Sequence, residues 1–312
     1  MAASLLFIDT NIFLDFYRVR SREAGLSILK HIDDNHAHLI MTSQVEMEFQ
    51  KNRQTVILEA HRGIKPSDGG LAIPSILAES KQSRALRRTQ KGIQDLSIKL
   101  RKRLANVLTD PGTYDPVYRT VHRLALADVP TNLNRENKLR YEIRKLAWKR
   151  FVLGYPPRKR GDTSIGDAIN WEWIVRCALD TGFNIVIVSR DSDYGEAFDA
   201  KPALNDWLAQ EFKDRVSRKR KLSLTDRLSE GLKAASIKVT KAEEQGEEDL
   251  LTQLQKVNRA LSESLGTYSG DPSTRHFLRG IWAGFTKPPS PEAPPKGLLA
   301  FLDDEPSPPA EA

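Results

Sequence analysis

The stretch NIVIVSRDSDYG, residues 184–195, carries the clearest fold signal in the chain. Its first half is a continuous β-branched run, which is typical of a strand buried on both faces of a parallel sheet. A second apolar run, SLLFI at 4–8, also ends directly in an aspartate, Asp9. In an open parallel sheet, ligands bind in the crevice at the carboxyl ends of the strands. We therefore expect Asp9 and Asp191 to point into one crevice.

Strand and helix signals alternate along much of the remaining chain. Further strands are expected at 38–41, 221–224 and 236–239. Helices are expected after an N-cap at Asp9 or Thr10, and over 43–58, 135–153, 164–180, 204–212 and 225–234. This alternation predicts an α/β fold with an open, mostly parallel sheet flanked by helices.

One internal segment departs from this alternation. Between residues 62 and 128 the strand signals stop, and Lys, Arg, Gln and Leu recur at helical spacing. We interpret 62–128 as a basic helical insertion. The α/β domain itself would then comprise 1–61 and 129–240.

The C-terminal part of the chain predicts two further regions. We expect a helical extension over 241–285, in which an apolar seam at 250–265 would pack on the body or on a second copy to form a homodimer. Residues 286–312 contain eight prolines and few large apolar residues. That composition predicts a disordered tail.

Composition excludes several classes of protein. With 312 residues, 39% of them hydrophobic, the chain can bury a full core. No apolar run approaches the roughly 20 residues of a membrane span, and the opening residues do not predict a signal peptide. The single cysteine, Cys177, excludes an internal disulfide framework and fits a reducing compartment. We therefore expect a cytoplasmic protein without membrane contact, with Cys177 in its core.

Positive charge is concentrated in three stretches. The net charge is +7. Residues 81–103 carry nine Lys or Arg against one acid, 138–160 carry nine against one, and 213–221 carry six against one. Each stretch alone would fit a solvated helix face, but three in one chain favour a polyanionic partner such as nucleic acid.

Acidic residues predict a metal site in the crevice. Asp167 lies in the first turn of a helix that we expect Ser164 to cap, where the helix dipole favours a carboxylate. Carboxylates that converge with Asp9 and Asp191 repel one another, so a divalent cation would be needed to neutralise them. The six histidines show no ligand spacing, and oxygen ligands alone suit Mg²⁺ or Mn²⁺ rather than zinc. Such a metal can activate water for attack on a phosphodiester.

Four segments together resemble the acidic motifs of PIN domains, in the same order. They are FIDTNIFLDF at 7–16, TSQVEMEFQKNR at 42–53, SIGDAINWEWI at 164–174 and VSRDSDYG at 188–195. The resemblance spans roughly residues 4–240 and implies a metal-dependent nuclease, with an endoribonuclease preferred over a DNA enzyme. PIN-like proteins include toxins, RNA-processing enzymes and possible defence effectors, and the sequence does not choose among them.

By this resemblance the metal ligands and catalytic residues are Asp9, Glu48, Asp167 and Asp191. Glu46 is the alternative to Glu48, and Asp193 is either an additional ligand or a solvated loop acid. The resemblance also implies that Thr10 or Asn11, together with Ser189, form hydrogen bonds to the ligands. Helical spacing places Asn170 near Asp167 and turns Glu172 away from the metal face.

Basic residues close to these motifs are candidate phosphate contacts. We expect the helical face of Arg84, Arg87, Arg88 and Lys91 to bind nucleic acid, followed by Arg158, Lys159 and Arg160. The tryptophans Trp148, Trp171 and Trp173 are expected in the core rather than stacked on bases.

Two other functions compete with the nuclease. The chain could be a catalytically silent nucleic-acid-binding or partner-binding protein, in which the acids only cap helices. Alternatively, Glu48 with Asp191 and Asp193 could form a Mg²⁺ site of the topoisomerase-primase type, which leaves Asp9 and Asp167 without a role. A phosphatase with an aspartyl nucleophile is disfavoured because Asn11 stands where a second aspartate would be expected.

Overall fold

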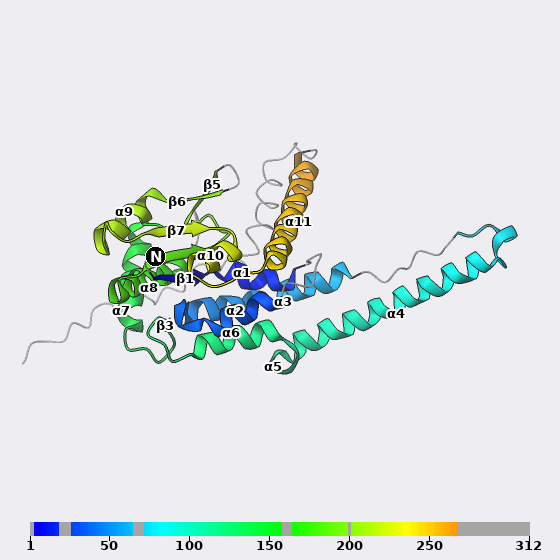
Figure 1. Ribbon diagram of the computed structural model, residues 1–312, viewed down its shortest axis with the longest axis horizontal. Coiled ribbons are helices and arrows are strands. Elements are labelled where there is room, and N and C mark those ends of the chain that lie inside the picture. Colours follow the sequence, from blue (N-terminus) through cyan, green and yellow to red (C-terminus); the bar gives the residue numbers. More distant parts are fainter. Residues whose placement is uncertain (1–2, 19–25, 65–71, 158–163, 199–200, 267–312) are drawn as a thin grey trace, which may run out of the picture. The chain divides into compact units, whose positions relative to one another are not determined.

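A computed structural model of the chain describes residues 3–18, 26–64, 72–157, 164–198 and 201–266 (Figure 1). Within the last helix, side chains are described as far as Lys256. The contacts between residues divide the chain into two compact units, residues 1–256 and residues 257–312. Among the helices in the described ranges, none is both long and apolar enough to cross a membrane.

The first unit is built on a five-stranded parallel sheet. Its strands are β1 (Ser4–Ile8), β2 (Leu39–Thr42), β3 (Asn132–Leu133), β4 (Asn184–Val188) and β7 (Leu222–Thr225). They are ordered β3-β2-β1-β4-β7, and all four pairings are parallel. This confirms the predicted α/β class with an open parallel sheet. A separate antiparallel hairpin, β5 (Gly195–Phe198) with β6 (Lys201–Leu204), was not expected from the sequence.

Strand order determines where a ligand can bind. The chain starts in the central strand β1, adds β2 and β3 on one side, and then adds β4 and β7 on the other. The order therefore reverses between β1 and β4, and such a switch point opens a crevice at the carboxyl ends of the two strands. The pairing runs in register from Ser4–Asn184 to Ile8–Val188, and the Asp9 N–H extends it by donating to the Val188 carbonyl at 3.0 Å.

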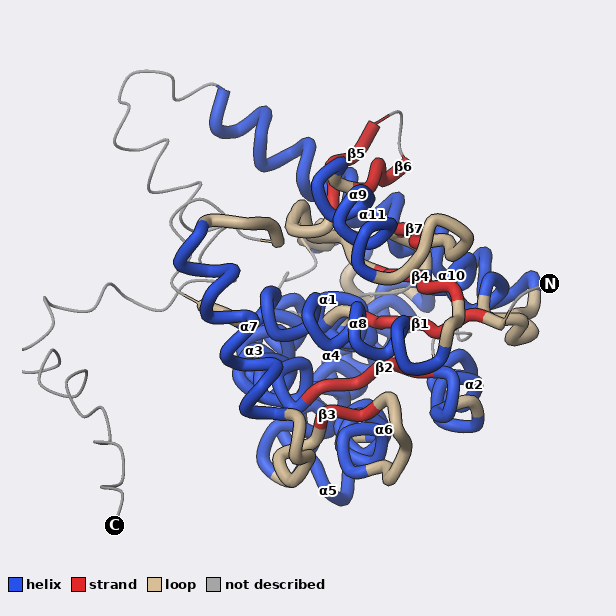
Figure 2. The backbone as a smooth tube through the Cα atoms, turned by 90° about the vertical axis from the view of Figure 1, so that its left-hand side faces the viewer, coloured by secondary structure: helices blue, strands red, loops and turns tan. Residues whose placement is uncertain are grey.

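Helices cover both faces of the sheet (Figure 2). They are α1 (Thr10–Leu14), α2 (Ser27–Asp34), α3 (Ser43–Gly63), α4 (Lys81–Thr109), α5 (Pro111–Tyr114), α6 (Pro116–Leu126), α7 (Arg140–Leu153), α8 (Gly166–Thr181), α9 (Asp206–Arg215), α10 (Leu228–Ala234) and α11 (Lys241–Gly266). Short 3-10 turns lie at Asp15–Tyr17, His36–His38 and Ser75–Leu77.

Side-chain alternation assigns the two faces of the sheet. Gly231 brings α10 against one face, since a Cβ there would lie 3.0 Å from Leu6 Cδ1 and would also meet Val188. Neighbouring strand residues point to opposite faces, so Phe7 points the other way, where its ring packs against Tyr194. The side chains of β1 from Leu5 onward and of β4 from Ile185 onward are buried, as expected for a central pair of parallel strands.

The predicted insertion has a long exposed helix and a buried one. α4 is exposed along most of its length and contacts α3 only near its C-terminal end (Figure 1). α6, in contrast, buries Val117, Val121 and Leu124 against the body. The segment is anchored by Arg53, whose Nε donates to the buried Asp115 carboxylate at 2.6 Å.

Three local predictions differ from the structure. Residues 236–239 form no strand, because Ser236 adopts φ 63° at the end of α10 and the backbone does not pair with the sheet. α8 begins at Gly166 with Ile165 as N-cap, although the Ser164 hydroxyl accepts from the Gly166 N–H at 3.1 Å. Trp148 is 57% exposed, whereas Trp171 and Trp173 are buried in the core as expected.

Candidate active site

Asp9 is held at the end of β1 by three hydrogen bonds. It is the N-cap of α1, and its Oδ1 accepts from the Thr10 N–H at 2.7 Å. Its Oδ2 accepts from the Asn11 side-chain amide at 2.8 Å and from the Ser189 hydroxyl at 2.6 Å. Because the side chain is buried and both oxygens are occupied, Asp9 has a fixed position at the switch point.

Glu48 reaches the same place from α3. Its Oε2 accepts from the Thr10 hydroxyl at 3.2 Å, and its Oε1 accepts from the Gln44 amide at 2.7 Å. Glu46 is turned elsewhere, since its Oε1 lies 2.9 Å from His122 Nδ1 on α6. The structure thus brings Glu48, rather than Glu46, next to the residue that follows Asp9.

Asp167 lies on the first turn of α8, the helix that packs closely against α3. The preceding glycine, Gly166, lies so close to α3 that a Cβ there would lie 2.6 Å from the Gln44 amide nitrogen and would collide with the Glu48 carboxylate. A second contact fixes the two helices, because the Thr42 hydroxyl at the start of α3 donates to the buried Asn170 Oδ1 at 2.6 Å. Asp167 and Glu48 are therefore positioned by one rigid helix pair.

Asp191 follows β4 in a loop that is tied back to Asp9. Its N–H donates to the Ser189 hydroxyl at 3.1 Å, and the neighbouring Arg190 N–H donates to Asn11 Oδ1 at 3.4 Å. Asp193, two residues later, is buried. Ser189 thus contacts both the first and the last acidic motif.

The electrostatics show that these carboxylates share one environment. Burial, the largest cause, and the charges of Asp191, Glu48 and Asp193 raise the pKa of Asp9 to about 8, against the opposing hydrogen bond from Ser189. A carboxyl with such a pKa holds its proton at neutral pH unless a positive charge is placed beside it. A cation bound among the acidic residues at this edge would therefore stabilise their ionised form.

The donor set fits a hard divalent cation in its chemistry. All the acids around Asp9 supply oxygen atoms, which Mg²⁺ and Mn²⁺ prefer, and neither histidine nor cysteine contributes. Within the described ranges, however, no three His, Cys, Asp or Glu side chains are arranged to hold a metal ion as they stand. The carboxylates would have to move closer together to bind a metal ion.

Glu172 lies outside this group. It is buried between two arginines, with Arg150 Nε 2.8 Å from its Oε1 and Arg215 Nη2 2.7 Å from its Oε2. Burial raises the pKa of Glu172, but the bonds and charges of Arg215 and Arg150 outweigh it and lower the pKa. Glu172 is thus a neutralised structural acid on α8.

Comparison with known families gives a match that spans this site. A family model described as PIN domain matches residues 6–194, which begins just before Asp9 and ends just after Asp193. The chain belongs to the PIN-domain family. No curated protein and no solved structure matches the chain. PIN domains are generally nucleases, and those nucleases typically use divalent metals.

The structure of this PIN-domain protein describes the first of the two sets of expected nucleic-acid contacts. Arg84, Arg87, Arg88 and Lys91 are exposed on α4. At about 100° per residue they share one side of the helix. Leu86, Ile93 and Leu100, spaced by seven residues, form a half-exposed apolar stripe on the opposite side. Residues 158–160, the second set of candidate contacts, lie outside the described residues.

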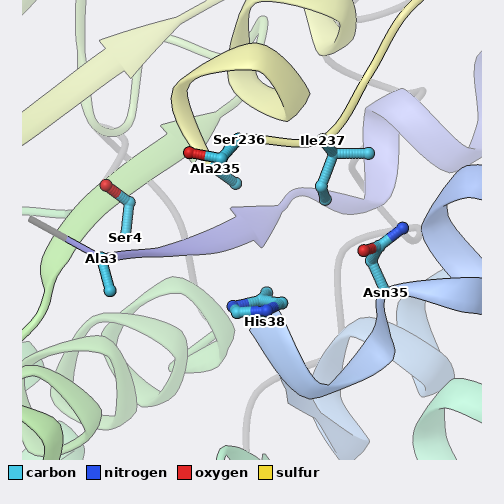
Figure 3. A pocket seen from close by; sticks show the side chains of 7 residues that line it. All are labelled: Ala3, Ser4, Asn35, His38, Ala235, Ser236 and Ile237. Carbon is cyan, nitrogen blue, oxygen red and sulfur yellow. The ribbon is translucent and has the colours of Figure 1, made fainter. Parts of the chain in front are cut away.

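A surface hollow of the PIN domain lies away from the acids (Figure 3). It measures about 300 Å³ and is lined by Ala3, Ser4, Asn35, His38 and residues 235–237. Ser4 begins β1, whereas Asp9 follows its end, so the hollow and the carboxylates lie at opposite edges of the sheet. No acid lines the hollow, which is therefore separate from the candidate active site around Asp9.

Several residues that shape the site were not among the predicted ones. Thr42 directly precedes the helix expected at 43–58 and opens the second motif, and Gln44 and Gly166 carried no signal beyond standing near the acids. Tyr194 stood in the last motif without a role. The helix-start pattern could have indicated Thr42, but the approach of α8 to α3 at Gly166 is a tertiary contact that no local pattern reports.

Proposed function

We propose that this PIN domain is a divalent-metal-dependent nuclease that hydrolyses phosphodiester bonds, and that it acts as an endoribonuclease. Asp9, Glu48, Asp167 and Asp191 would hold Mg²⁺ or Mn²⁺, with Asp193 as an additional ligand. Thr10, Asn11 and Ser189 would orient these carboxylates through the hydrogen bonds described above. Asn170 would support Asp167 from the next turn of α8.

One observation carries this proposal. Asp9, Glu48, Asp191 and Asp193 lie within electrostatic range of one another at the switch point between β1 and β4, where burial, first, and then the charges of the other three acids raise the pKa of Asp9 to about 8. Buried like charges are costly unless a cation neutralises them. A protein that used these acids only to cap helices would have no reason to gather them.

The chain's own residues would prepare the reaction. A bound divalent cation would supply an activated water and stabilise charge on the phosphoryl oxygens. Ser189 and Asn11 hold the Asp9 carboxyl group in place by donating to its Oδ2. Thr10 and Gln44 do the same for the two oxygens of Glu48. Fixed donors of this kind reduce the rearrangement needed when substrate binds.

Basic surface residues would offset the repulsion between substrate and acids. Arg84, Arg87, Arg88 and Lys91 form an exposed basic face on α4, whose C-terminal end is fixed to α3, the helix of Glu48. Phosphate contacts from such a face give affinity and orientation rather than sequence specificity. The insertion at 62–128 would thus bind substrate, while 1–61 and 129–240 would carry the chemistry.

A catalytically silent nucleic-acid-binding protein is the second candidate. It is favoured by the finding that no three acids in the described ranges are placed ready to hold a metal ion. Binding of RNA without cleavage, in both Mg²⁺ and Mn²⁺, would support this candidate. The topoisomerase-primase type of site is less favoured, because Asp9 lies at the centre of the acidic group.

Cleavage by the full chain tests the proposal directly. Labelled linear and circular RNA, and matched DNA, would be incubated with the purified protein in Mg²⁺, Mn²⁺ or EDTA. We expect cleavage of circular as well as linear RNA, which identifies an endonuclease, and no cleavage in EDTA. Preferential cleavage of DNA would overturn the assignment of RNA.

Two glutamates on α3 provide a matched pair of variants. Glu48→Gln should abolish cleavage, whereas Glu46→Gln, two residues away and directed to His122, should leave it within about twofold of wild type. Equal effects of the two variants would show that the acidic group described here is not the catalytic centre.

A further inference from the structure

Tyr194 has a buried hydroxyl group that the fold does not satisfy. Its side chain is 0% exposed, and its ring packs edge-on against Phe7 with centroids 6.0 Å apart. Among the described residues, the hydroxyl oxygen has no hydrogen-bond partner. A phenylalanine would supply the same ring contacts without burying a polar group, and buried polar groups are normally hydrogen-bonded. The hydroxyl therefore needs an explanation beyond packing.

The position of the hydroxyl group suggests that explanation. Tyr194 directly follows Asp193, and its ring contacts Phe7, two residues before Asp9. Burial, first, and then the charges of Asp167, Asp9, Asp193 and Glu48 raise the pKa of the Tyr194 hydroxyl well above its usual value. The hydroxyl thus lies within electrostatic range of the acidic group, and a phenol hydroxyl can donate a hydrogen bond to a carboxylate.

We propose that the Tyr194 hydroxyl is a positioning group of the metal centre, which donates a hydrogen bond to a carboxylate of the acidic group when a divalent cation is bound. The inference rests on the metal site of the proposed function. The acids must close to hold a cation, because no three of those described are yet arranged to do so. Their closure would bring an acceptor to the Tyr194 hydroxyl, which has no partner among the described residues.

The proposal predicts opposite effects on two quantities. Tyr194→Phe removes a donor that has no acceptor among the described residues, so the free energy of unfolding in EDTA should stay equal or increase. The same change should weaken the binding of Mn²⁺ by about tenfold, because a hydrogen bond to a charged group is lost. A tyrosine with a purely structural role would not produce this combination.

Tyr17 provides the matched control. Its hydroxyl donates to the Asp115 carboxylate at 2.6 Å, and Asp115 is not among the acids that shift the pKa of Asp9. Tyr17→Phe should therefore lower the melting temperature in EDTA and leave the Mn²⁺ affinity of the folded protein within about twofold of wild type. Both variants remove a tyrosine hydroxyl oxygen. The Tyr17 hydroxyl has a hydrogen-bond partner, whereas the Tyr194 hydroxyl has none among the described residues.

The experiment measures Mn²⁺ binding by calorimetry and thermal unfolding in EDTA, on the full chain of wild type and both variants. Weaker Mn²⁺ binding by Tyr194→Phe, with an unchanged or raised melting temperature, supports the proposal. Unchanged Mn²⁺ affinity, or a lowered melting temperature in EDTA, overturns it while leaving the proposed function intact. Absence of Mn²⁺ binding by the wild type would overturn both.

Discussion

The Ser189 hydroxyl donates to Asp9 Oδ2 at 2.6 Å and so joins the end of β4 to the end of β1. The Ser189 hydroxyl oxygen also accepts a hydrogen bond from the Asp191 N–H at 3.1 Å. One small side chain thus sets the relative position of two proposed metal ligands. Because Ser189 and Asp9 are 180 residues apart in sequence, this relationship exists only in the folded chain.

Ser189→Ala should impair metal binding more than folding. The lost hydrogen bond should cost about 1 kcal/mol of stability, while misplacement of Asp9 and Asp191 should reduce metal affinity by roughly 10- to 100-fold. Calorimetry with Mn²⁺ and chemical denaturation measure the two effects. Ser192→Ala, at an exposed position in the same loop, is the control and should change neither. Wild-type affinity in Ser189→Ala would show that this bond does not position the ligands.

Gly166→Ala should displace Glu48 with little loss of stability. The new Cβ would meet the ends of Glu48 and Gln44, which are flexible side chains that can move away. Cleavage should fall by about 10²-fold or more, because a misplaced ligand disturbs the catalytic geometry. Gly92→Ala on α4, where nothing lies within 4 Å, should leave activity unchanged and add up to about 1 kcal/mol of stability. Full activity in Gly166→Ala would exclude Glu48 from the centre.

Stability in EDTA should fall as pH rises between about 4 and 8. The pKa of Asp9 is raised from 3.8 in the unfolded reference to about 8 in the fold, so the folded state binds the proton more tightly. This stabilisation is fully present below pH 4 and is lost as pH rises through 8. Asp9→Asn should flatten the profile of melting temperature against pH. A profile in EDTA that is the same for wild type and Asp9→Asn would contradict the assigned pKa.

Glu247→Gln should loosen the loop that carries Asp191. The buried Glu247 carboxylate on α11 accepts from the N–H groups of Leu228 and Ser229 at 2.6 and 2.9 Å and pairs with Arg190 at 3.3 Å. Arg190 is also paired with Asp15, so it joins the last acidic motif to the first. We expect a loss of about 2 kcal/mol, measured by denaturation, and faster amide exchange at Asp191.

Glu248→Gln is the control for this prediction. Glu248 is the next residue of α11, but it is half-exposed and pairs with the exposed part of Arg227. Surface pairs contribute little, so the change should cost less than about 1 kcal/mol. Equal costs of the two variants would show that α11 does not support the Asp191 loop. A chain that ends at residue 240 would lose the Glu247 contacts altogether and should be less stable than the full chain.

Replacement of Arg84, Arg87 and Arg88 with alanine should weaken RNA binding and reduce its dependence on salt. If all three contact phosphates of a single strand, the slope of log K against log salt should flatten by about 2. Lys30, Lys238 and Lys241 are exposed outside the three basic stretches, and their joint replacement removes the same charge as a control. Equal slopes for the two triple variants would place the substrate path elsewhere.

Much of the fold could be predicted from local patterns. The β-branched run at 184–188 and the apolar run at 4–8 are central strands because only a buried parallel strand tolerates such continuous apolarity. The strand expected at 236–239 was wrong, because Ser236 turns the chain into a left-handed conformation that no apolar pattern reveals. The hairpin β5–β6 was missed because each of its strands has only four residues and contains a residue typical of loops, Gly195 or Pro202.

The sequence by itself determined the α/β class, the two aspartates at strand ends and the PIN-like order of the acidic motifs, since each depends on residues adjacent in the chain. Only the tertiary structure decided that β1 and β4 are neighbours, that Glu48 rather than Glu46 lies beside Thr10, and that Tyr194 buries its hydroxyl near the acids. The physical reason is that strand order and helix approach are set by packing between distant segments. Asp9, which the sequence placed at a strand end, acquires its raised pKa only through that packing.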